Sequence, residues 1–231
     1  MSKTSQILQA TLLVALIVAG VWFYYNMNGR RVVLVQPPKK ETALDADAYV
    51  VPKKLHPQDL KDAKALMLQP VWVREGYRYF YMAYGPPVDT RHAAGMLGPI
   101  ERLEIKDVIV QGAPGVAGRQ VMAVFEKDGK RYAFSIGDAD NGTYHIYSDE
   151  MLFIQDPHDL YKHWPADVWE AIDQHQVKAG MSELQASFAI GVGIPEGLGT
   201  TNPRIVNYPN GGHSVKVTYE NGKATEVKTS Q

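Results

Sequence analysis

Histidine is the side chain of this sequence with the widest chemistry, because a neutral imidazole serves as a general base or as a metal ligand. The chain has seven histidines and no cysteine, which excludes thiolate nucleophiles and cysteine-ligated zinc. No two histidines have the H-E-x-x-H or H-x-H spacing of a metal site. His158 and His163 are five positions apart, on different faces of a helix, but Asp156 and Asp159 lie beside them. We predict no catalytic residue, no metal ligand and no cofactor, with a site built on these histidines as the alternative.

Two glycine-rich stretches invite comparison with phosphate-binding loops, namely residues 112–118 (GAPGVAG) and 180–195 (GMSELQASFAIGVGIP). Both lack the lysine and hydroxyl residue of a Walker loop, and neither has the G-x-G-x-x-G pattern between a strand and a helix. The first predicts a connecting loop. In the second, Ser182 and Gln185 form a capping box that begins a helix, and Gly191 or Gly193 ends it before Pro195.

The stretch DADNG at 138–142 has the composition of a calcium loop but not its register. Such a loop needs glycine at its sixth position and glutamate at its twelfth. Counted from Asp138, Gly142 is fifth and Glu150 thirteenth. We predict a polar turn and leave an irregular calcium site open. No serine lies in a G-x-S-x-G nucleophile elbow.

Aromatic residues are dense in GYRYFYMAYGPP, which begins at Gly76. Alternate side chains of a strand point to opposite faces, so about half of these rings belong in a core. The others form a candidate surface for a protein, glycan or lipid headgroup. The residues of this candidate interaction surface are Tyr77, Tyr79, Tyr81 and Tyr84.

Residues 7–25 (ILQATLLVALIVAGVWFYY) carry no charge. As a helix they reach roughly 28 Å, about one hydrocarbon core, so we predict a membrane span. Its aromatic end would lie at the headgroup level and serve as a membrane-interface anchor, formed by Trp22, Phe23, Tyr24 and Tyr25. The alternative is a cleaved signal peptide with Lys3 as its basic region.

Two charge patterns bear on the orientation of this span, and they favour opposite orientations. Lys3 favours a cytoplasmic N-terminus, whereas Arg30, Arg31, Lys39 and Lys40 favour keeping the C-terminal side inside. We expect a single-pass protein of the inner (cytoplasmic) membrane with its soluble part in the periplasm, a choice that relies on the family resemblance described below.

The remaining sequence predicts an α+β protein with four parts. Residues 1–28 form the tail and transmembrane helix, and the proline-containing segment 29–58 is an extended tether. Residues 59–160 form a β-rich soluble domain, mostly antiparallel, that begins with a short helix over 59–68 and contains a hairpin at Asp128-Gly129. Residues 161–231 form a C-terminal module of two helices and three strands.

Within this C-terminal module, Pro165 begins a helix with Val168, Trp169 and Ile172 in one apolar stripe. The capped helix comes next, and turns at 210–212 and 221–222 separate the three strands of a meander. We expect Leu184, Phe188 and Ile190 of the second helix to face a core.

The order of these elements resembles the small outer-membrane assembly lipoproteins of the BamE/SmpA type and related β-lactamase-inhibitor-like domains. The resemblance covers roughly residues 165–229 and rests on Gly180, Met181, Ser182, Gln185, Gly193, Pro195 and the Asn221-Gly222-Lys223 turn. It implies a helix-helix-three-strand fold that acts as an envelope interaction module. The chain departs from the family in having no lipidated cysteine and in carrying a separate β-rich region before the motif.

The charge balance narrows the function further. The chain has 24 Lys and Arg against 25 Asp and Glu, a net charge of -1, which gives no basic field for nucleic acid. Our first hypothesis is a non-enzymatic accessory or scaffold subunit, held in the lipid bilayer, whose soluble domains bind a larger membrane or envelope protein complex. The alternatives are an envelope enzyme with a site between the two soluble regions, and a cytoplasmic-side cap of an integral-membrane electron-transfer or light-harvesting complex.

Overall fold

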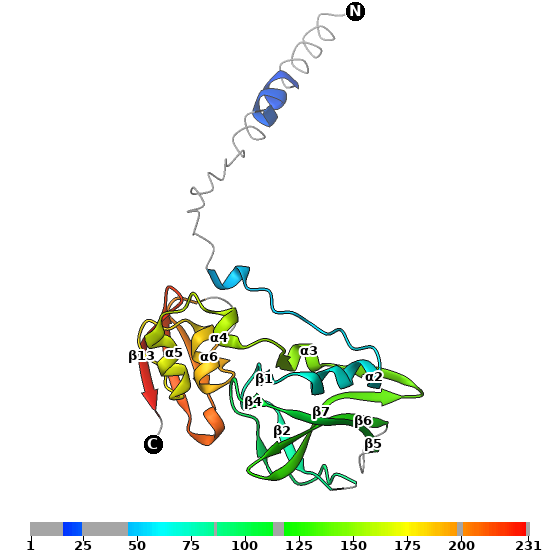
Figure 1. Ribbon diagram of the computed structural model, residues 1–231. Coiled ribbons are helices and arrows are strands. Elements are labelled where there is room, and N and C mark those ends of the chain that lie inside the picture. The colour runs from blue at the N-terminus through cyan, green and yellow to red at the C-terminus, as the bar shows by residue number, and fades with distance from the viewer. Residues whose placement is uncertain (1–15, 25–45, 86, 113–117, 198–200, 230–231) are drawn as a thin grey trace, which may run out of the picture. The chain divides into compact units, whose positions relative to one another are not determined.

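The computed structural model describes residues 16–24, 46–85, 87–112, 118–197 and 201–229 (Figure 1). The contacts divide the chain into two compact units, Met1–Leu44 and Asp45–Gln231. The second unit has a mixed α+β fold with mostly antiparallel sheets, which confirms the predicted fold class at that level.

In the first unit, residues 16–24 are helical and their side chains are exposed, including Trp22, Phe23 and Tyr24. Within the described residues, every helix is too short or too polar to traverse a bilayer. The predicted span covers 7–25, and its residues 7–15 and Tyr25 lie outside the described part. The transmembrane helix therefore stays a prediction.

The predicted tether also lies partly outside the described residues, which resume at Ala46. Residues 46–58 belong to the second unit, where the 3-10 helix η1 (Ala46–Tyr49) leads into extended chain. The predicted helix over 59–68 is present as α2 (Leu60–Ala63) followed by the 3-10 helix η2 (Lys64–Leu68). Asp59 caps α2 because its carboxylate accepts from the main-chain N–H of Asp62.

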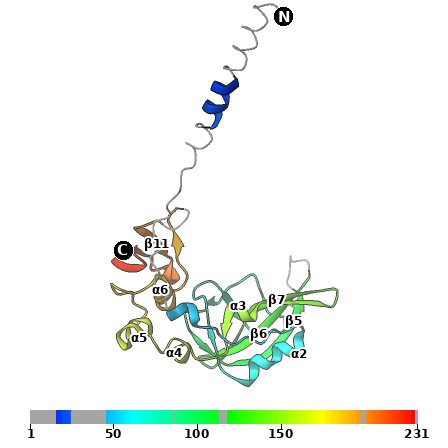
Figure 2. The same ribbon diagram turned by 90° about the horizontal axis from the view of Figure 1, so that it is seen from above.

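The main sheet has the order β3-β2-β7-β6-β5, with β8 paired to β7, and every pair is antiparallel. Its strands are β2 (Phe80–Ala83), β3 (Gly95–Met96), β5 (Ile105–Gly112), β6 (Arg119–Lys127), β7 (Lys130–Asp140) and β8 (Thr143–Ile146). Strand β6 is buried from Val121 to Phe125, because both of its faces pack against hydrophobic clusters. The helices α2 and η2 lie beside β5 of this sheet, and their Ala63 and Leu66 side chains are buried against it (Figure 2).

The turns of the main sheet are formed by residue types that favour positive φ. Asp128 and Gly129, with φ of 52° and 71°, join β6 to β7, which confirms the predicted hairpin. The DADNG stretch ends β7, and its Asn141-Gly142 pair is the polar turn before β8. The loop predicted over 112–118 has residues 113–117 outside the described part.

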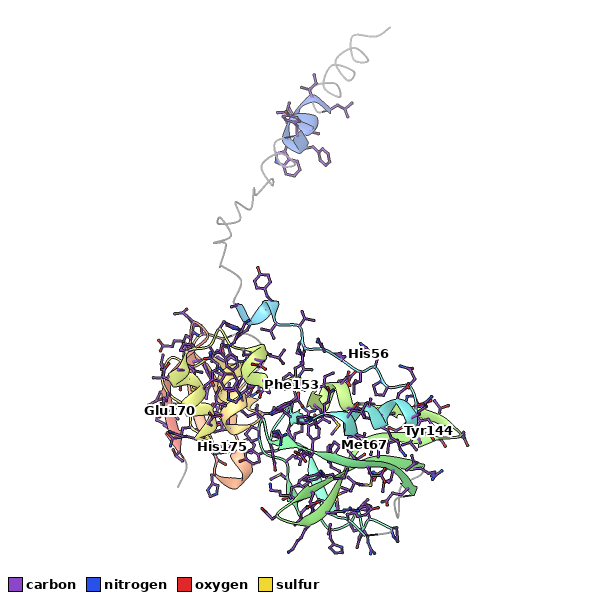
Figure 3. All side chains as sticks on the ribbon, in the orientation of Figure 1. His56, Met67, Tyr144, Phe153, Glu170 and His175 are labelled. Atoms are coloured by element: carbon purple, nitrogen blue, oxygen red, sulfur yellow. The ribbon has the colours of Figure 1, made fainter. Side chains whose placement is uncertain are left out.

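A second sheet, in the order β4-β1-β9, links the two main hydrophobic clusters. The main-sheet cluster includes Leu66, Val121, Phe125 and Phe134, and the C-terminal cluster includes Trp169, Phe188, Tyr208 and Tyr219. Its strands are β1 (Val71–Val73), β4 (Arg102–Leu103) and β9 (Leu152–Phe153), and α3 (Ser148–Met151) precedes β9. Because side chains alternate along a strand, Leu152 packs with the main sheet whereas Phe153 packs with the C-terminal cluster (Figure 3). Val73 and Trp72 divide between the clusters in the same way.

The C-terminal elements pack around the other cluster. They are α4 (Pro157–Leu160), α5 (Ala166–Asp173), α6 (Glu183–Ile190), β10 (Ile194–Pro195), β11 (Arg204–Tyr208), η3 (Asn210–Gly212), β12 (Val215–Glu220) and β13 (Lys223–Thr229). The strands form one antiparallel sheet in the order β10-β11-β12-β13, so the expected meander carries an additional short edge strand.

The capped second helix is present as predicted. The Ser182 hydroxyl accepts from the Gln185 main-chain N–H at 3.2 Å, and the Gln185 side chain accepts from the Ser182 N–H at 2.8 Å. Gly191 ends α6 at a φ of 82°. Phe188 and Ile190 are buried, whereas Leu184 is 36% exposed, because it lies at the open first turn of the helix.

Candidate functional site

A cleft of about 590 Å³ lies where the main-sheet cluster and the C-terminal cluster meet. Apolar side chains from both sides line it, among them Trp72, Tyr77, Ile100 and Ile172. Its charged and polar lining comes from Glu101, Arg102, Lys127, His158, Asp173 and His175. The cleft thus combines an apolar floor with a rim of both charges.

Backbone strain is concentrated at this cleft. In the described residues, eight non-glycine residues have positive φ, and four of them are Asp or Asn, which tolerate this conformation in turns. The other four are His56, Tyr77, Ile100 and His175, and the last three all line the cleft. Each such residue costs about 1–2 kcal/mol, and strain of this kind clusters at functional sites.

Tyr77, with a φ of 57°, is held by contacts from both sides of the cleft. Its N–H donates to the carbonyl oxygen of Leu97 at 2.7 Å. Its ring lies against Gly191 and Gly211, where an added Cβ would come within 2.9 Å and 3.0 Å of ring atoms. The N–H of Val192 donates to the Gly76 carbonyl at 3.3 Å. The glycine that ends α6 therefore also provides the close approach that joins the C-terminal elements to the loop before β2.

Glu101 fixes the turn that places Ile100 at a φ of 44°. One carboxylate oxygen accepts from the Gly98 N–H at 2.7 Å, and the other contacts Lys127 Nζ at 2.6 Å. Burial alone would lower the pKa of Lys127, but the hydrogen bond and the charge of Glu101 outweigh it and raise that pKa. Lys127 therefore stays charged on the rim of the cleft.

His175 stands directly after α5, in the left-handed position where glycine is usual. Its N–H donates to the Ile172 carbonyl at 2.9 Å, and the next N–H, of Gln176, donates to Ala171 at 2.8 Å, which is a Schellman motif. The ring Nδ1 lies 3.0 Å from the carbonyl oxygen of Ala189. Because a carbonyl only accepts, Nδ1 donates a proton to this bond, and His175 is one of the residues that line the cleft.

The two histidines singled out in the sequence do not converge. His158 stacks on Trp169 with ring centroids 4.0 Å apart, and its two nitrogens lie 3.0 Å from Asp156 and 3.4 Å from Asp173. His163 Nε2 instead contacts Asp47 at 2.6 Å, and the same carboxylate oxygen accepts from the Trp164 indole at 2.6 Å. Across the described ranges, no group of three or more His, Cys, Asp or Glu residues could hold a metal ion.

The four tyrosines of the candidate interaction surface have different surroundings. Tyr77 lines the cleft, whereas Tyr79 and Tyr81 pack against the main-sheet cluster and Tyr84 packs against the small cluster around Met82. Burial first, and then the charge and hydrogen bond of Glu75, raise the pKa of Tyr79 to about 12. Tyr81 packs edge-on against Phe125. Of the four, the structure brings only Tyr77 to the cleft.

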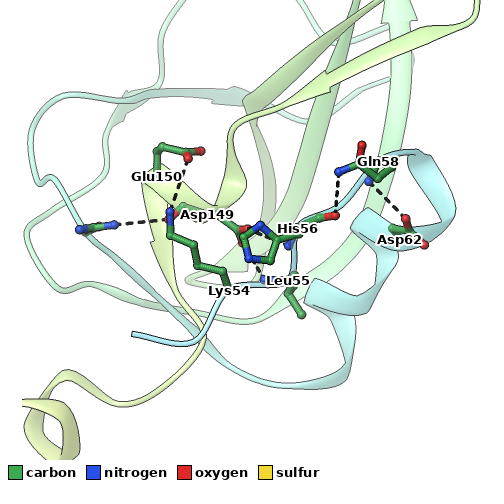
Figure 4. A network of polar contacts seen from close by, with 8 residues as sticks. Lys54, Leu55, His56, Gln58, Asp62, Asp149 and Glu150 are labelled. Atoms are coloured by element: carbon green, nitrogen blue, oxygen red, sulfur yellow. Dashed lines mark hydrogen bonds and ion pairs between the residues drawn. The ribbon is translucent and has the colours of Figure 1, made fainter. Parts of the chain in front are cut away.

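A polar clip holds the segment before α2 onto the folded unit (Figure 4). The carboxylate of Asp149 accepts from the main-chain N–H groups of Leu55 at 2.9 Å and His56 at 2.7 Å. Its side chain is only 9% exposed, so the charged acceptor of these two bonds is largely buried. Lys54 and Glu150 add an ion pair at 3.8 Å on the outside of the clip. The clip fixes the path of the chain as it enters the unit.

Apart from Tyr77 and His158, sequence reasoning missed the cleft residues as site residues, and Trp72, Ile100 and His175 are three of those missed. Their signals, a half-buried strand residue and two left-handed positions, depend on neighbours that are remote in the sequence. Comparison of the chain with family models, curated proteins and solved structures finds no match.

Proposed function

We propose that this protein is a non-enzymatic accessory or scaffold subunit, anchored by one membrane span, whose cleft binds a segment of a larger membrane or envelope protein complex. The observation that carries the proposal is the convergence of Tyr77, Ile100 and His175, all at positive φ, on one cleft. Protein-binding surfaces typically have aromatic side chains at their centre and a polar rim, and here Trp72 and Tyr77 line the cleft while Arg102 lies on its rim.

The membrane anchor in this proposal comes from the uncharged stretch 7–25 and its aromatic end. The placement of the soluble part in the periplasm, and its reading as an envelope interaction module, come from the resemblance of residues 165–229 to BamE/SmpA-type domains. A cytoplasmic-side position is the competing arrangement.

Site-specific photo-cross-linking in native membranes tests the binding cleft. A benzophenone amino acid at Arg102, on the cleft rim, should give a discrete product with a membrane or envelope protein. Arg91 is the matched control, because it is also an exposed arginine and lies outside the cleft. Trp72→Ala should reduce the Arg102 product about tenfold, as expected of a buried aromatic contact worth about 1.4 kcal/mol or more. Equal products from both positions would contradict a binding cleft.

Membrane attachment and sidedness need a separate experiment. The full chain should resist extraction by alkaline carbonate, whereas a chain lacking residues 1–28 should be released. Protease treatment of spheroplasts should degrade the soluble part if it is periplasmic. Protection in spheroplasts, with degradation only after lysis, would instead place it on the cytoplasmic side.

The position of His175 on the cleft, with Nδ1 held by Ala189, supports a second candidate, an envelope enzyme that uses Nε2 of this imidazole as a general base. In that case His175→Gln, which keeps a polar side chain but cannot take up a proton, would abolish the cellular function while leaving the Arg102 cross-link intact. A binding subunit predicts that function and cross-link change together.

A further inference from the structure

The C-terminal sheet has two edges, and they differ in their ability to pair with another strand. Strand β10, at one edge, is only two residues long and contains Pro195, which has no N–H to donate. Strand β13, at the other edge, spans seven residues without proline (Figure 1). The edge open to further pairing is therefore that of β13.

The open part of the β13 edge is defined by hydrogen bonds. Ala224 uses its outward main-chain groups within the unit: its N–H donates to Met181 at 2.8 Å, and its carbonyl accepts from Gly180 at 2.8 Å. Beyond Ala224, residues 225–229 are exposed, and among the described residues Glu226 to Thr229 pair only with β12. Thr225 lies at a β-bulge in this ladder, where its hydroxyl donates to the Thr218 carbonyl at 3.2 Å. The open edge thus has five residues, and Val227 is its centre.

We infer that the β13 edge is the interface of a symmetric homodimer, in which residues 225–229 of two copies pair antiparallel about a two-fold axis at Val227. In the register that pairs all five residues, each Glu226 faces Lys228 of the second copy, and each Lys228 faces the other Glu226. Lysines on an edge strand usually prevent pairing. Lys228 already contacts Glu226 of its own strand at 2.9 Å, and in this register it also faces Glu226 of the second copy, so the two ion pairs join into one network of alternating charges.

The apolar contact of this register is equally specific. Val227 pairs with Val217 of β12. Val217 is fully buried, and paired residues point to the same face, so both side chains lie on the core face of the sheet. Val227 itself is 38% exposed at the end of that row. In the dimer the two Val227 side chains meet, which continues the core row from one copy into the other and forms one eight-stranded sheet.

Disulfide trapping of the full chain tests the register, because the natural sequence has no cysteine. In native membranes treated with copper(II)-phenanthroline as the oxidant, Val227→Cys should form a covalent dimer, since facing residues in an antiparallel pair lie within disulfide reach. Thr225→Cys is the matched control: two such residues would be about 13 Å apart in this register. Mixing the Thr225→Cys and Thr229→Cys chains should restore the cross-link.

Charge exchange tests the interface without cross-linking. Either Glu226→Lys or Lys228→Glu alone places two like charges opposite each other at both symmetry-related contacts of the dimer. The dimerisation affinity of the detergent-purified full chain, measured by sedimentation, should fall about tenfold. The double exchange E226K/K228E should recover the original affinity. A monomeric wild-type chain, equal cross-linking of the Val227 and Thr225 variants, or capture of a different protein through Val227→Cys would overturn the inference. None of these outcomes depends on the binding cleft.

Discussion

The ring of Tyr77 lies beside Gly191, so that a Cβ atom on this glycine would be 2.9 Å from the ring and 2.6 Å from the carbonyl oxygen of Gly76. Gly191 also ends α6 at a φ of 82°. A single glycine therefore serves as the cap of a helix and as the contact that brings the C-terminal elements against the strained side of the cleft.

Gly191→Ala should destabilise the protein by about 3 kcal/mol or more, because its backbone, with φ of 82° and ψ of −171°, lies in a region that essentially only glycine adopts. This backbone strain costs about 1–3 kcal/mol, and the clash with main-chain atoms adds to it. Gly197→Ala is the control, since Gly197 has the same φ of 82° but no atom within 4 Å of an added Cβ. The Gly197→Ala variant should lose only the part of the unfolding free energy that comes from backbone strain. Urea denaturation measures both variants, and equal losses would mean that the close approach at Gly191 carries no energy.

The strain at His175 can be measured by comparing two replacements of the same side chain. Both His175→Gly and His175→Ala remove the imidazole, but only alanine keeps the strain of a φ of 54°. We expect the glycine variant to be more stable by about 1 kcal/mol. At the neighbouring Gln176, which has no positive φ, the order should reverse and alanine should be the more stable. The same order at both positions would refute the assigned strain.

Asp149→Ala should cost about 2–3 kcal/mol, because it leaves the N–H groups of Leu55 and His56 without their charged acceptor. Amide hydrogen exchange at these two residues should accelerate more than exchange in β6. Glu150→Ala removes an exposed partner of a 3.8 Å ion pair and should change stability by less than about 0.5 kcal/mol. If Asp149→Ala were equally mild, the clip would not hold this segment.

The buried tyrosines of the C-terminal sheet predict a loss of stability at alkaline pH. The hydroxyls of Tyr208 and Tyr219 are 2.7 Å apart. Burial raises the pKa of Tyr219 to about 12, although the hydrogen bond from Tyr208 lowers it, and burial together with the charge of Tyr219 raises the pKa of Tyr208 further. Because the folded pKa values lie above the unfolded value of about 10, the stabilisation is complete below pH 10 and is lost as pH rises through 12.

Urea denaturation between pH 8 and pH 12 measures this loss. The double variant Tyr208→Phe/Tyr219→Phe keeps the ring volume but has no hydroxyl to ionise, so its stability should fall less steeply above pH 10 than that of the natural chain. Parallel curves for the two proteins would show that other groups cause the alkaline loss.

Elements set by neighbouring residues could be predicted from the sequence. The capping box of Ser182 and Gln185 and the Asp128-Gly129 hairpin depend on contacts within a few positions, and both are present. The helix that the sequence predicts over 59–68 is present at this position, but only Leu60–Ala63 is α-helical and Lys64–Leu68 is a 3-10 helix. Packing rather than periodicity decides which type of helix such a short segment forms.

The cleft could not be predicted, because its residues come from β1, β3, β4, β6, α4, the end of α5 and the loops next to them. The alternative site at His158 and His163 shows the same limit, since each ring contacts a carboxylate that spacing did not indicate for it: Asp173 for His158 and Asp47 for His163. The expectation that both lie on one helix is also wrong, because α4 ends at Leu160 and His163 follows in a turn. Their separation in the sequence therefore indicates neither a helix face nor the distant segment that packs against each ring.

The sequence by itself determined the α+β class of this protein, the Asp128-Gly129 turn and the capping box that begins α6, because hydrophobic period and backbone preference act locally. Only the tertiary structure decided that Tyr77, Ile100 and His175 share one cleft and that, within the described part of the chain, the β13 edge is open over residues 225–229. The physical reason is that strained backbone and unpaired strand edges acquire their meaning from contacts between segments far apart along the chain.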